Sequence, residues 1–427
     1  MKLSSILGLN ARTQLFAYKY NTKRGKMTAD SKIQTARVLK AAEIPHPLIF
    51  YKFKRLEEVN NFVWEGLPSS FVLKPSRGMG GEGIVVVKKK VEGGWMTTQR
   101  KKVTVEDLML HTQDVLEGAF SMGNVPDAAI IQEYVGRHKA FRRYSYRGTP
   151  DIRIIVFNKV PVMAMLRLPT KESGGRANLH QGALAVGVDI ATGITTSAIW
   201  HGNEIRLKPG SKRKLHGIKI PNWTTCLETA VRAQMVSGLG YVGVDIILHP
   251  ERGPMVLELN AQPGLQIQLA NMTGLRKRLD RVEDLEVRDA EHGVKIARAL
   301  FTSGFSERVK GEETKVLNPV EKLTVYSYDQ KKKMSLDARV DTGAKRSSID
   351  RVLAQGLGLL AENNILWKDR YQYRSATGLQ TRPVVSVKIV LAGKKFRTSA
   401  SVADRKKMKH KFLLGRNDLT GFYVKTT

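Results

Sequence analysis

The chain is poor in cysteine: among its 427 residues only Cys226 carries a thiol, so no internal disulfide can form. A lone thiol of this kind is typical of proteins in a reducing compartment. The sequence also lacks an apolar run of the roughly 18 residues that a membrane-spanning helix needs. The apolar part of its first residues is too short for a secretory signal. We therefore expect a cytoplasmic location and no membrane partner.

Acidic residues are also scarce, since 39 Asp and Glu stand against 71 Lys and Arg and leave a formal net charge of +32. An excess of this size attracts polyanions such as nucleic acid, a ribosome, anionic lipid or an acidic peptide. Aromatic residues make up only 7%, and the basic runs are spread along the chain without the stacking motifs of single-strand binders. The composition does not distinguish among these polyanions, and simple solvation of the surface explains the basic runs equally well.

Near its middle the chain does contain three hard oxygen ligands in one short region. Glu258 and Asn260 lie two residues apart in an aliphatic run, so a strand would turn both side chains to the same face. Asp245 lies in the preceding aliphatic run, before a turn with Gly and Pro, and would join them from the antiparallel neighbour. Carboxylate and amide oxygens suit Mg²⁺, which completes its shell with water and substrate phosphates. The sequence therefore predicts a metal hairpin with a nucleotide nearby.

A glycine-rich stretch upstream is a candidate phosphate site. Lys74 lies in a short apolar run, Gly78, Gly80 and Gly81 follow, and a valine run comes next. Small residues let backbone N–H groups approach phosphate oxygens. The stretch is neither a P-loop nor a dinucleotide fingerprint, because both need a helix where the valine run predicts a strand. A plain β-turn is the alternative for the glycines alone; together with the metal hairpin they predict a phosphate flap.

In their order along the chain, these and several further motifs resemble the ATP-grasp superfamily, and within it the RimK-like glutamate ligases. The motifs are Asp30-Ser-Lys32, the Lys74 strand with its flap, Ile130 to Val135, Asp151-Ile-Arg153, Gly175 to His180, and the hairpin of Asp245, Glu258 and Asn260. The resemblance covers about residues 30–300. It implies an α+β ATP-grasp fold, with ATP and Mg²⁺ as cofactors and Mn²⁺ as an alternative ion.

The resemblance also implies roles for individual residues. Lys32 and Lys74 would contact the ATP phosphates under the glycine flap, and the acidic hairpin would hold magnesium. The adenine would contact the backbone of a hinge that consists of Gln132, Glu133, Tyr134 and Val135.

The chemistry follows from cations placed at the terminal phosphates. Lysine and Mg²⁺ stabilise the charge on a phosphoryl group during its transfer. A carboxylate acceptor becomes an acylphosphate, and an amine attacks it through an oxyanion that needs a fixed donor. We expect Arg153, Arg167, Arg176 and Asn178 to supply such donors; arginines solvated at the surface are the alternative in so basic a chain. His180 lies in an apolar context and is interpreted as a core residue rather than a general base.

The last part of the chain predicts a small all-β module, with short alternating segments at 323–328, 335–340, 384–391 and 396–402. Its Asp341-Thr-Gly motif after an apolar strand, and the later Gly415-Arg-Asn, resemble the retropepsin-like fold, in particular the small proteins labelled ATP-dependent zinc proteases. Aspartic proteases use two carboxylates, so Asp341 would be catalytic only in a homodimer. An ordinary turn is the alternative for Asp341. The module has no zinc-ligand cluster, because His410 is its only histidine and no cysteine accompanies it.

We therefore expect four parts: a basic N-terminal arm at 1–28, an ATP-grasp ligase domain at 29–303, a polar linker at 304–319 and a retropepsin-like barrel at 320–427. A hydrophobic content of 42% is enough for more than one core. Apolar residues at helical spacing predict helices at 35–42, 105–119, 224–237 and 290–301.

Two functions of different class fit these patterns. The first is an ATP- and Mg²⁺-dependent ligase that joins an amino acid, glutamate by resemblance, to a carboxylate of a peptide or protein through an acylphosphate. Its C-terminal module would cleave or recognise the same substrate. The second is a basic, nucleotide-dependent protein that binds nucleic acid or the ribosome without ligation. The two lysines, the flap and the three metal ligands favour the ligase, because a clamp could lose one of them without penalty.

Overall fold

The computed structural model of the chain describes residues 5–78, 80–121, 123–301, 316–367, 372–375, 378–419 and 422–425. These residues form two compact units: residues 1–189 and 193–283 (unit 1), and residues 190–192 and 284–427 (unit 2). Most of the expected linker, residues 304–315, lies outside the described residues. Within the described ranges, no helix is long and apolar enough to cross a membrane.

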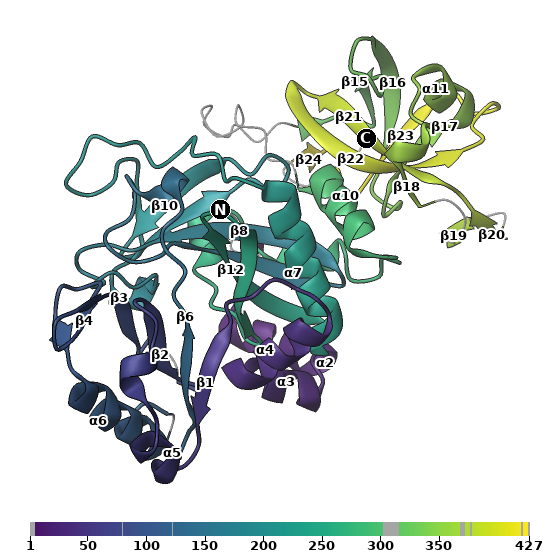
Figure 1. The fold of residues 1–427 in the computed structure, drawn as a ribbon. Helices are drawn as coiled ribbons and strands as arrows, with labels where there is room; N and C mark the ends of the chain where they lie inside the picture. The colour runs from purple at the N-terminus through teal and green to yellow at the C-terminus, as the bar shows by residue number, and fades with distance from the viewer. Residues whose placement is uncertain are drawn as a thin grey trace. The chain divides into compact units, whose positions relative to one another are not determined.

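Unit 1 contains an antiparallel sheet of six strands in the order β1-β6-β2-β3-β4-β5. The strands are β1 (Ile49–Phe53), β2 (Phe71–Pro75), β3 (Val85–Val91), β4 (Gly94–Thr97), β5 (Lys102–Val103) and β6 (Ala129–Glu133). Helices α5 (Leu56–Asn60) and α6 (Val105–Leu116) pack against this sheet (Figure 1). A capping box starts α6: the Thr104 hydroxyl accepts from the Asp107 N–H at 3.3 Å, and the Asp107 carboxylate accepts from the Thr104 N–H at 2.9 Å.

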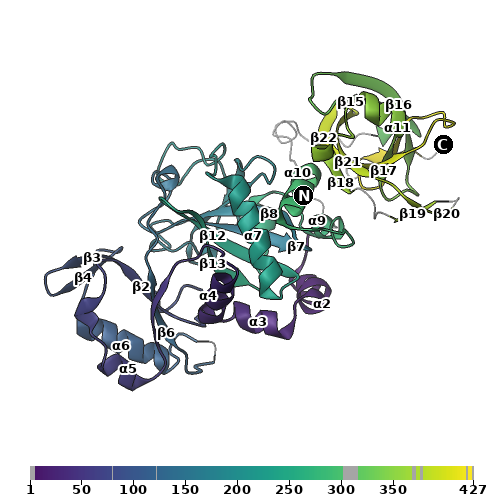
Figure 2. The same cartoon turned by 45° about the vertical axis from the view of Figure 1, so that its right-hand side comes forward.

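The second sheet of unit 1 has seven antiparallel strands in the order β11-β10-β9-β8-β7-β12-β13. They are β7 (Asp151–Phe157), β8 (Val160–Leu168), β9 (Leu184–Val188), β10 (Thr195–Trp200), β11 (Asn203–Ile205), β12 (Tyr241–His249) and β13 (Gly253–Asn260). Every residue of β7 and β8 is buried, so both faces must be covered, because alternate side chains point to opposite faces. Helix α7 (Trp223–Ser237) contacts β7, β8, β12 and β13 (Figure 2), and α8 (Ile267–Ala270) contacts β8, β9 and β10.

The N-terminal segment of unit 1 is helical. It consists of α1 (Leu9–Ala11), a π-helical turn (Arg12–Ala17), α2 (Tyr18–Tyr20), α3 (Lys23–Ala29) and α4 (Lys32–Ala41). The Phe16 ring is buried, with its centroid 5.4 Å from that of Phe157 on β7 and 5.8 Å from that of Tyr241 on β12. The described part of the expected arm, residues 5–28, is therefore packed on the seven-stranded sheet as part of unit 1.

Unit 2 contains a closed barrel of six strands in the order β15-β16-β23-β17-β22-β21, because β15 also pairs with β21. The strands are β15 (Val320–Tyr326), β16 (Lys333–Asp341), β17 (Ser347–Asp350), β21 (Val384–Leu391), β22 (Lys394–Ala403) and β23 (Phe412–Gly415), and β18 (Ile365–Trp367) adds to β21. Shorter pairs are β14 (Val316–Leu317) with β24 (Tyr423–Val424) and β19 (Gln372–Ser375) with β20 (Gly378–Thr381). The predicted all-β module is confirmed as a barrel; its retropepsin-like identity stays a prediction.

The four predicted helices are confirmed as α4, α6, α7 and α10 (Ala290–Leu300), and α9 (Arg276–Asp280) and α11 (Arg351–Gly356) complete the set of helices in the described residues. Helix α6 ends three residues before the predicted end, where Gly118 takes a φ of +90° that favours glycine. Helix α10 belongs to unit 2, whereas the expected ligase domain extends to residue 303. The expected domain bounds therefore stay a prediction.

Candidate active site

A cavity of about 1120 Å³ in unit 1 is lined by residues of both sheets. With one exception, every site residue predicted within this unit lines it. They are Lys32, Lys74, Gly78, Gly80, Gly81, Gln132, Glu133, Tyr134, Val135, Arg153, Arg167, Arg176, Asn178, Glu258 and Asn260. The exception is Asp245, which is fully buried. The structure thus brings together residues that are more than 200 positions apart in the sequence.

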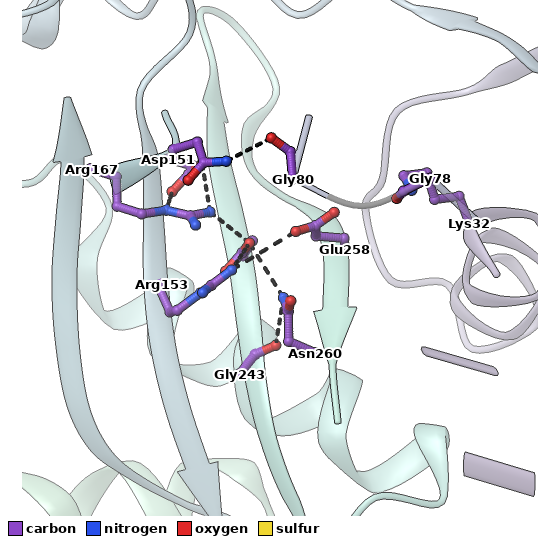
Figure 3. A network of polar contacts seen from close by, with 11 residues as sticks. Lys32, Gly78, Gly80, Asp151, Arg153, Arg167, Gly243, Glu258 and Asn260 are labelled. Carbon is purple, nitrogen blue, oxygen red and sulfur yellow. Dashed lines mark hydrogen bonds and ion pairs between the residues drawn. The ribbon is translucent and has the colours of Figure 1, made fainter. Parts of the chain in front are cut away.

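Two lysines contribute positive charge to the cavity wall. Lys32 begins α4, and its ammonium donates to the Ser76 carbonyl at 3.4 Å. It also donates to the Gly78 carbonyl at 3.0 Å (Figure 3). Lys74 lies on β2 and is buried. Burial, and then the nearby Lys32 ammonium, lower the pKa of Lys74 to about 7, although Glu258 acts in the opposite direction. An anion bound beside Lys74 would favour the charged form of the lysine.

The glycine flap is a strand-turn-strand hairpin as predicted, because β2 pairs with β3 across the turn. Gly80 and Gly81 have φ values of +65° and +82°, where a residue with a Cβ is strained. The Gly80 carbonyl accepts from the Asn178 side-chain amide at 2.6 Å (Figure 3). Asn178 therefore joins the flap to the loop that carries Arg176.

The hinge residues lie at the end of β6, because Gln132 and Glu133 are its last two residues and Tyr134 and Val135 follow it. The Gln132 side-chain amide donates to the Pro47 carbonyl at 3.2 Å. The Glu133 carboxylate accepts from the Leu48 N–H at 3.1 Å and forms an ion pair with Arg252. These side chains are engaged in holding the edge of the cavity, and the Val135 carbonyl accepts from the Thr149 hydroxyl at 2.7 Å. Contact of the hinge backbone with adenine stays a prediction. An apolar wall that sequence reasoning missed continues the hinge; it includes Val72, Val86, Ile247 and Leu257.

The predicted metal hairpin is confirmed as a hairpin: β12 and β13 are antiparallel, with Asp245 opposite Glu258 and Gly243 opposite Asn260. Glu258 and Asn260 face the cavity, and the Glu258 side chain is 36% exposed. The Asn260 amide nitrogen points to Asp245, at 3.4 Å from its carboxylate, so the amide oxygen is free to face the cavity (Figure 3). Glu258 and Asn260 thus place two oxygen-bearing side chains at the cavity wall, with Arg153 Nη2 at 3.8 Å from the Glu258 carboxylate. Their role as Mg²⁺ ligands stays a prediction.

Asp245 takes a different position from the one that its sequence pattern suggests. Its carboxylate accepts two bonds of 2.7 Å from Arg153, through Nε and Nη2, and one of 2.6 Å from Arg167 Nη2. Burial alone would raise the pKa of Asp245, but Arg153 and Arg167 hold the pKa well below its usual value. In this structure Asp245 anchors the two arginines rather than facing the cavity. Its role as a metal ligand stays a prediction.

Asp151 is a site residue that sequence reasoning missed as such. Its carboxylate accepts from Arg167 through Nε at 2.5 Å and Nη2 at 2.8 Å, and both side chains are buried. Asp151 and Arg153 alternate on β7, while Arg167 on β8 and Asp245 on β12 are their cross-strand neighbours. The sequence signal was the two-residue spacing of Asp151 and Arg153, which turns both to one face of a strand. Two arginines and two aspartates therefore form one charge-balanced network on the sheet (Figure 3).

Two other expectations concern single residues. His180 lies on the short 3₁₀ helix Leu179–Gln181 and is exposed at the cavity, so the interpretation as a core residue is wrong. The cause is local: Asn178 caps this turn by accepting from the His180 N–H at 3.0 Å, which turns the apolar run outward. Asp341 ends β16 in unit 2, and its carboxylate accepts from the N–H groups of Gly343 at 2.8 Å and Ala344 at 3.1 Å. This is a turn geometry, and a catalytic role for Asp341 stays a prediction.

Comparison with known proteins identifies the family to which this chain belongs. Residues 11–284 match the model of a family described as sugar-transfer associated ATP-grasp. Proteins named "probable alpha-L-glutamate ligase" from Maridesulfovibrio salexigens and Picosynechococcus sp. are 28% identical over 184 residues and 31% identical over 185 residues. Each match covers 43% of this chain and 44% of the relative, so the chain spans less than half the length of these relatives.

A solved structure of D-alanine–D-alanine ligase from Bacillus anthracis, complexed with ATP, is also similar to the chain. It is 14% identical and matches with a TM-score of 0.37 over 62% of this chain and 68% of that one.

The lowered pKa of Lys74 predicts a pH-dependent affinity for ATP. A bound triphosphate must raise the pKa of Lys74 above its value of about 7 in the free protein. The lysine's contribution is then complete below pH 7 and is lost by up to roughly tenfold per pH unit above it. Isothermal titration calorimetry between pH 7 and 9 measures this loss, together with proton uptake on binding. In Lys74→Arg the charge is permanent, so the ATP affinity of this variant should fall less steeply with pH than that of the unaltered chain. An equal dependence of affinity on pH in both proteins would contradict the prediction.

The network predicts a large cost for removing one of its carboxylates. Asp151→Asn leaves the buried Arg153 and Arg167 to share the Asp245 carboxylate, so one buried positive charge is unbalanced, which should lower the free energy of unfolding by about 3 kcal/mol. Asp280→Asn is the control, since Asp280 pairs with Arg276 at the surface and should contribute less than about 1 kcal/mol. Denaturant unfolding followed by the tryptophans of unit 1 compares the two. Equal stability of the two variants would show that the buried pair does not form.

Proposed function

We propose, because this chain belongs to the sugar-transfer associated ATP-grasp family, that it is a ligase that uses ATP and Mg²⁺ to join a carboxylate to an amine. ATP and Mg²⁺ are the cofactors of ATP-grasp enzymes. The observation that carries the proposal is the single cavity on which two lysines, a glycine flap, a hinge, two open oxygen ligands and two buried arginines converge.

The donor set fits a magnesium nucleotide. Glu258 and Asn260 supply one carboxylate and one amide oxygen at the cavity wall, and Mg²⁺ commonly takes few protein ligands and completes its octahedron with phosphate oxygens and water. Bound there, the ion would neutralise the terminal phosphates of ATP. Lys32 and Lys74 would add positive charge from the flap side, and the apolar wall beside the hinge would contact the base.

The arginine network supports the second half of the reaction. Arg153 and Arg167 each donate through Nε and Nη2 to buried carboxylates, and within the described residues the Nη1 of each has no protein acceptor. Because two bonds fix each guanidinium plane, its remaining N–H groups are preorganised at the cavity. We assign them to the oxygens of an acylphosphate and to the oxyanion that forms when an amine attacks it. Arg176 and Asn178 would add donors from the flap side.

Finer features of the function are also proposals. Glutamate as the added amino acid is suggested by the names of the relatives, and a peptide or protein as the acceptor by the family resemblance. The barrel of unit 2 is proposed to be retropepsin-like, since Asp341 at the end of β16 lies beside Gly415 of the parallel β23. Cleavage of a peptide by this module would need a homodimer, and ribosome binding is a further expectation from the net charge alone.

The ligase is tested by the release of phosphate from ATP in the presence of Mg²⁺ and a panel of amino acids with peptide acceptors. We expect release that depends on both an amino acid and a carboxylate acceptor. Release that depends only on RNA or DNA would instead favour the alternative of a nucleotide-dependent nucleic-acid clamp.

The metal ligand is tested with Glu258→Gln, which removes a negative oxygen from the cavity wall. We expect the Mg²⁺-dependent part of ATP affinity to fall about tenfold or more, and amino-acid-dependent phosphate release to be lost. Glu251→Gln changes an exposed residue in the turn of the same hairpin and should leave both unchanged. Unaltered Mg²⁺ dependence in the Glu258 variant would remove this residue from the metal site.

The second module is tested with Asp341→Asn. Asparagine retains an oxygen that can accept from the Gly343 and Ala344 N–H groups, so the barrel should stay folded and ligation should be unchanged. Any cleavage of a quenched fluorescent peptide by the full chain should be lost. Cleavage that persists in the variant would deny Asp341 a catalytic role.

A further inference from the structure

Two stretches of unit 1 carry much of its positive charge. Residues 137–147 contain five Lys or Arg, residues 206–219 contain six, and neither stretch contains an Asp or Glu. We call the cations of these two stretches the basic surface. Most of them are exposed, including Lys139, Arg142 and Arg143 in the first stretch and Lys212 and Arg213 in the second.

The two stretches lie side by side, because the Lys208 ammonium donates to the Arg143 carbonyl at 3.3 Å. The second stretch is itself a hairpin turn, in which the Lys208 N–H donates to the Arg213 carbonyl at 2.8 Å and the Leu215 N–H to the Arg206 carbonyl at 3.0 Å. Burial, and then Arg213 and Arg137, lower the pKa of Lys208, as expected where like charges gather. The backbone thus holds these cations close together.

No carboxylate balances them. Across the described part of the chain, none of the cations of the basic surface takes part in an ion pair. The contacts that anchor their side chains are to carbonyl oxygens, such as that from Arg137 to Ser145 at 3.2 Å and that from Arg147 to Gln99 at 3.0 Å. Unbalanced like charges destabilise a fold, so this arrangement is suited to a partner that supplies the missing negative charge.

The basic surface borders the mouth of the cavity. Its first stretch, residues 137–147, is separated from the hinge residues Tyr134 and Val135 by one residue and is followed directly by Gly148 and Thr149. These four flanking residues line the cavity. Gln99, which accepts from Arg147, lines it as well. A chain that lies on the basic surface can therefore place one end in the cavity.

We propose that the basic surface docks an acidic stretch of a polypeptide acceptor, whose reactive carboxylate enters the cavity. The reaction of that carboxylate rests on the proposed function, whereas the binding of the acidic stretch does not. The surface offers little to the bases of a nucleic acid, because Tyr144 and Tyr146 are only part-exposed and the Arg147 guanidinium covers the Tyr146 ring at 5.0 Å. It offers little to a membrane, since Leu207 is the one large apolar side chain that is exposed in these two stretches of the described chain.

The test measures binding of a fluorescein-labelled peptide of about ten residues, mostly glutamate, to the full chain without ATP. Anisotropy should show binding that weakens as salt rises, and the same peptide with glutamine in place of glutamate should not bind. The variant Arg142→Glu/Arg143→Glu/Lys212→Glu should bind the acidic peptide about tenfold more weakly or less. Its affinity for ATP should be unchanged, because none of the three residues lines the cavity.

The matched control is Arg37→Glu/Lys40→Glu/Lys52→Glu, which makes the same change in net charge at exposed positions of unit 1 outside both stretches and the cavity wall. It should bind the peptide nearly as the unaltered chain does. Equal losses in both triple variants would overturn the basic surface in favour of net charge alone.

Two further probes, a ten-nucleotide RNA and vesicles that contain phosphatidylserine, test the class of partner. If either bound more tightly than the peptide, and lost that binding in the first triple variant, the proposal of an acidic peptide partner would be overturned. Failure of the proposed function is separately visible, because peptide binding without amino-acid-dependent phosphate release would leave the docking intact and remove the ligase.

Discussion

The charge-balanced network of Asp151, Arg153, Arg167 and Asp245 is the interaction on which the site depends. It joins the three adjacent strands β8, β7 and β12 of one sheet, and all four side chains are buried. An isolated charge could not remain in such a place, so each arginine requires its carboxylate. The same bonds fix the direction in which the guanidinium groups face the cavity. The same hydrogen bonds therefore stabilise the sheet and place the donor groups at the cavity.

The features that the sequence predicted well depend on local patterns. The glycine flap and the hairpin of β12 and β13 follow from turn residues between aliphatic runs, and Glu258 and Asn260 from a spacing of two. The partners of Asp245 could not be predicted in this way. Arg153 and Arg167 are 92 and 78 positions away, and only the pairing of β7 with both β8 and β12 brings them together. A pattern that suits a metal ligand also suits the anchor of an arginine, because both need a carboxylate on the same face.

The cavity and the basic surface that borders it place cations in opposite surroundings. Lys74 is held in a buried place where its charge is costly, whereas the cations of the basic surface are solvated and crowded. The first arrangement favours a compact, highly charged anion that replaces the missing solvent, and the second favours an extended anion that spreads over several positions. The excess of Lys and Arg therefore includes cations suited to different anions. For this reason the composition alone could not identify the binding partner.

The closed barrel of unit 2 has a consequence for how molecules of this protein behave in crowded solution. Each of its six wall strands has a hydrogen-bonded neighbour on both sides, and the strand that extends the wall, β18, is three residues long. Open strand edges are the usual template on which foreign chains stack into fibrils. The described wall offers almost no such template, so the barrel wall itself is a poor surface for edge-to-edge aggregation, even without the charged gatekeepers that open sheets require.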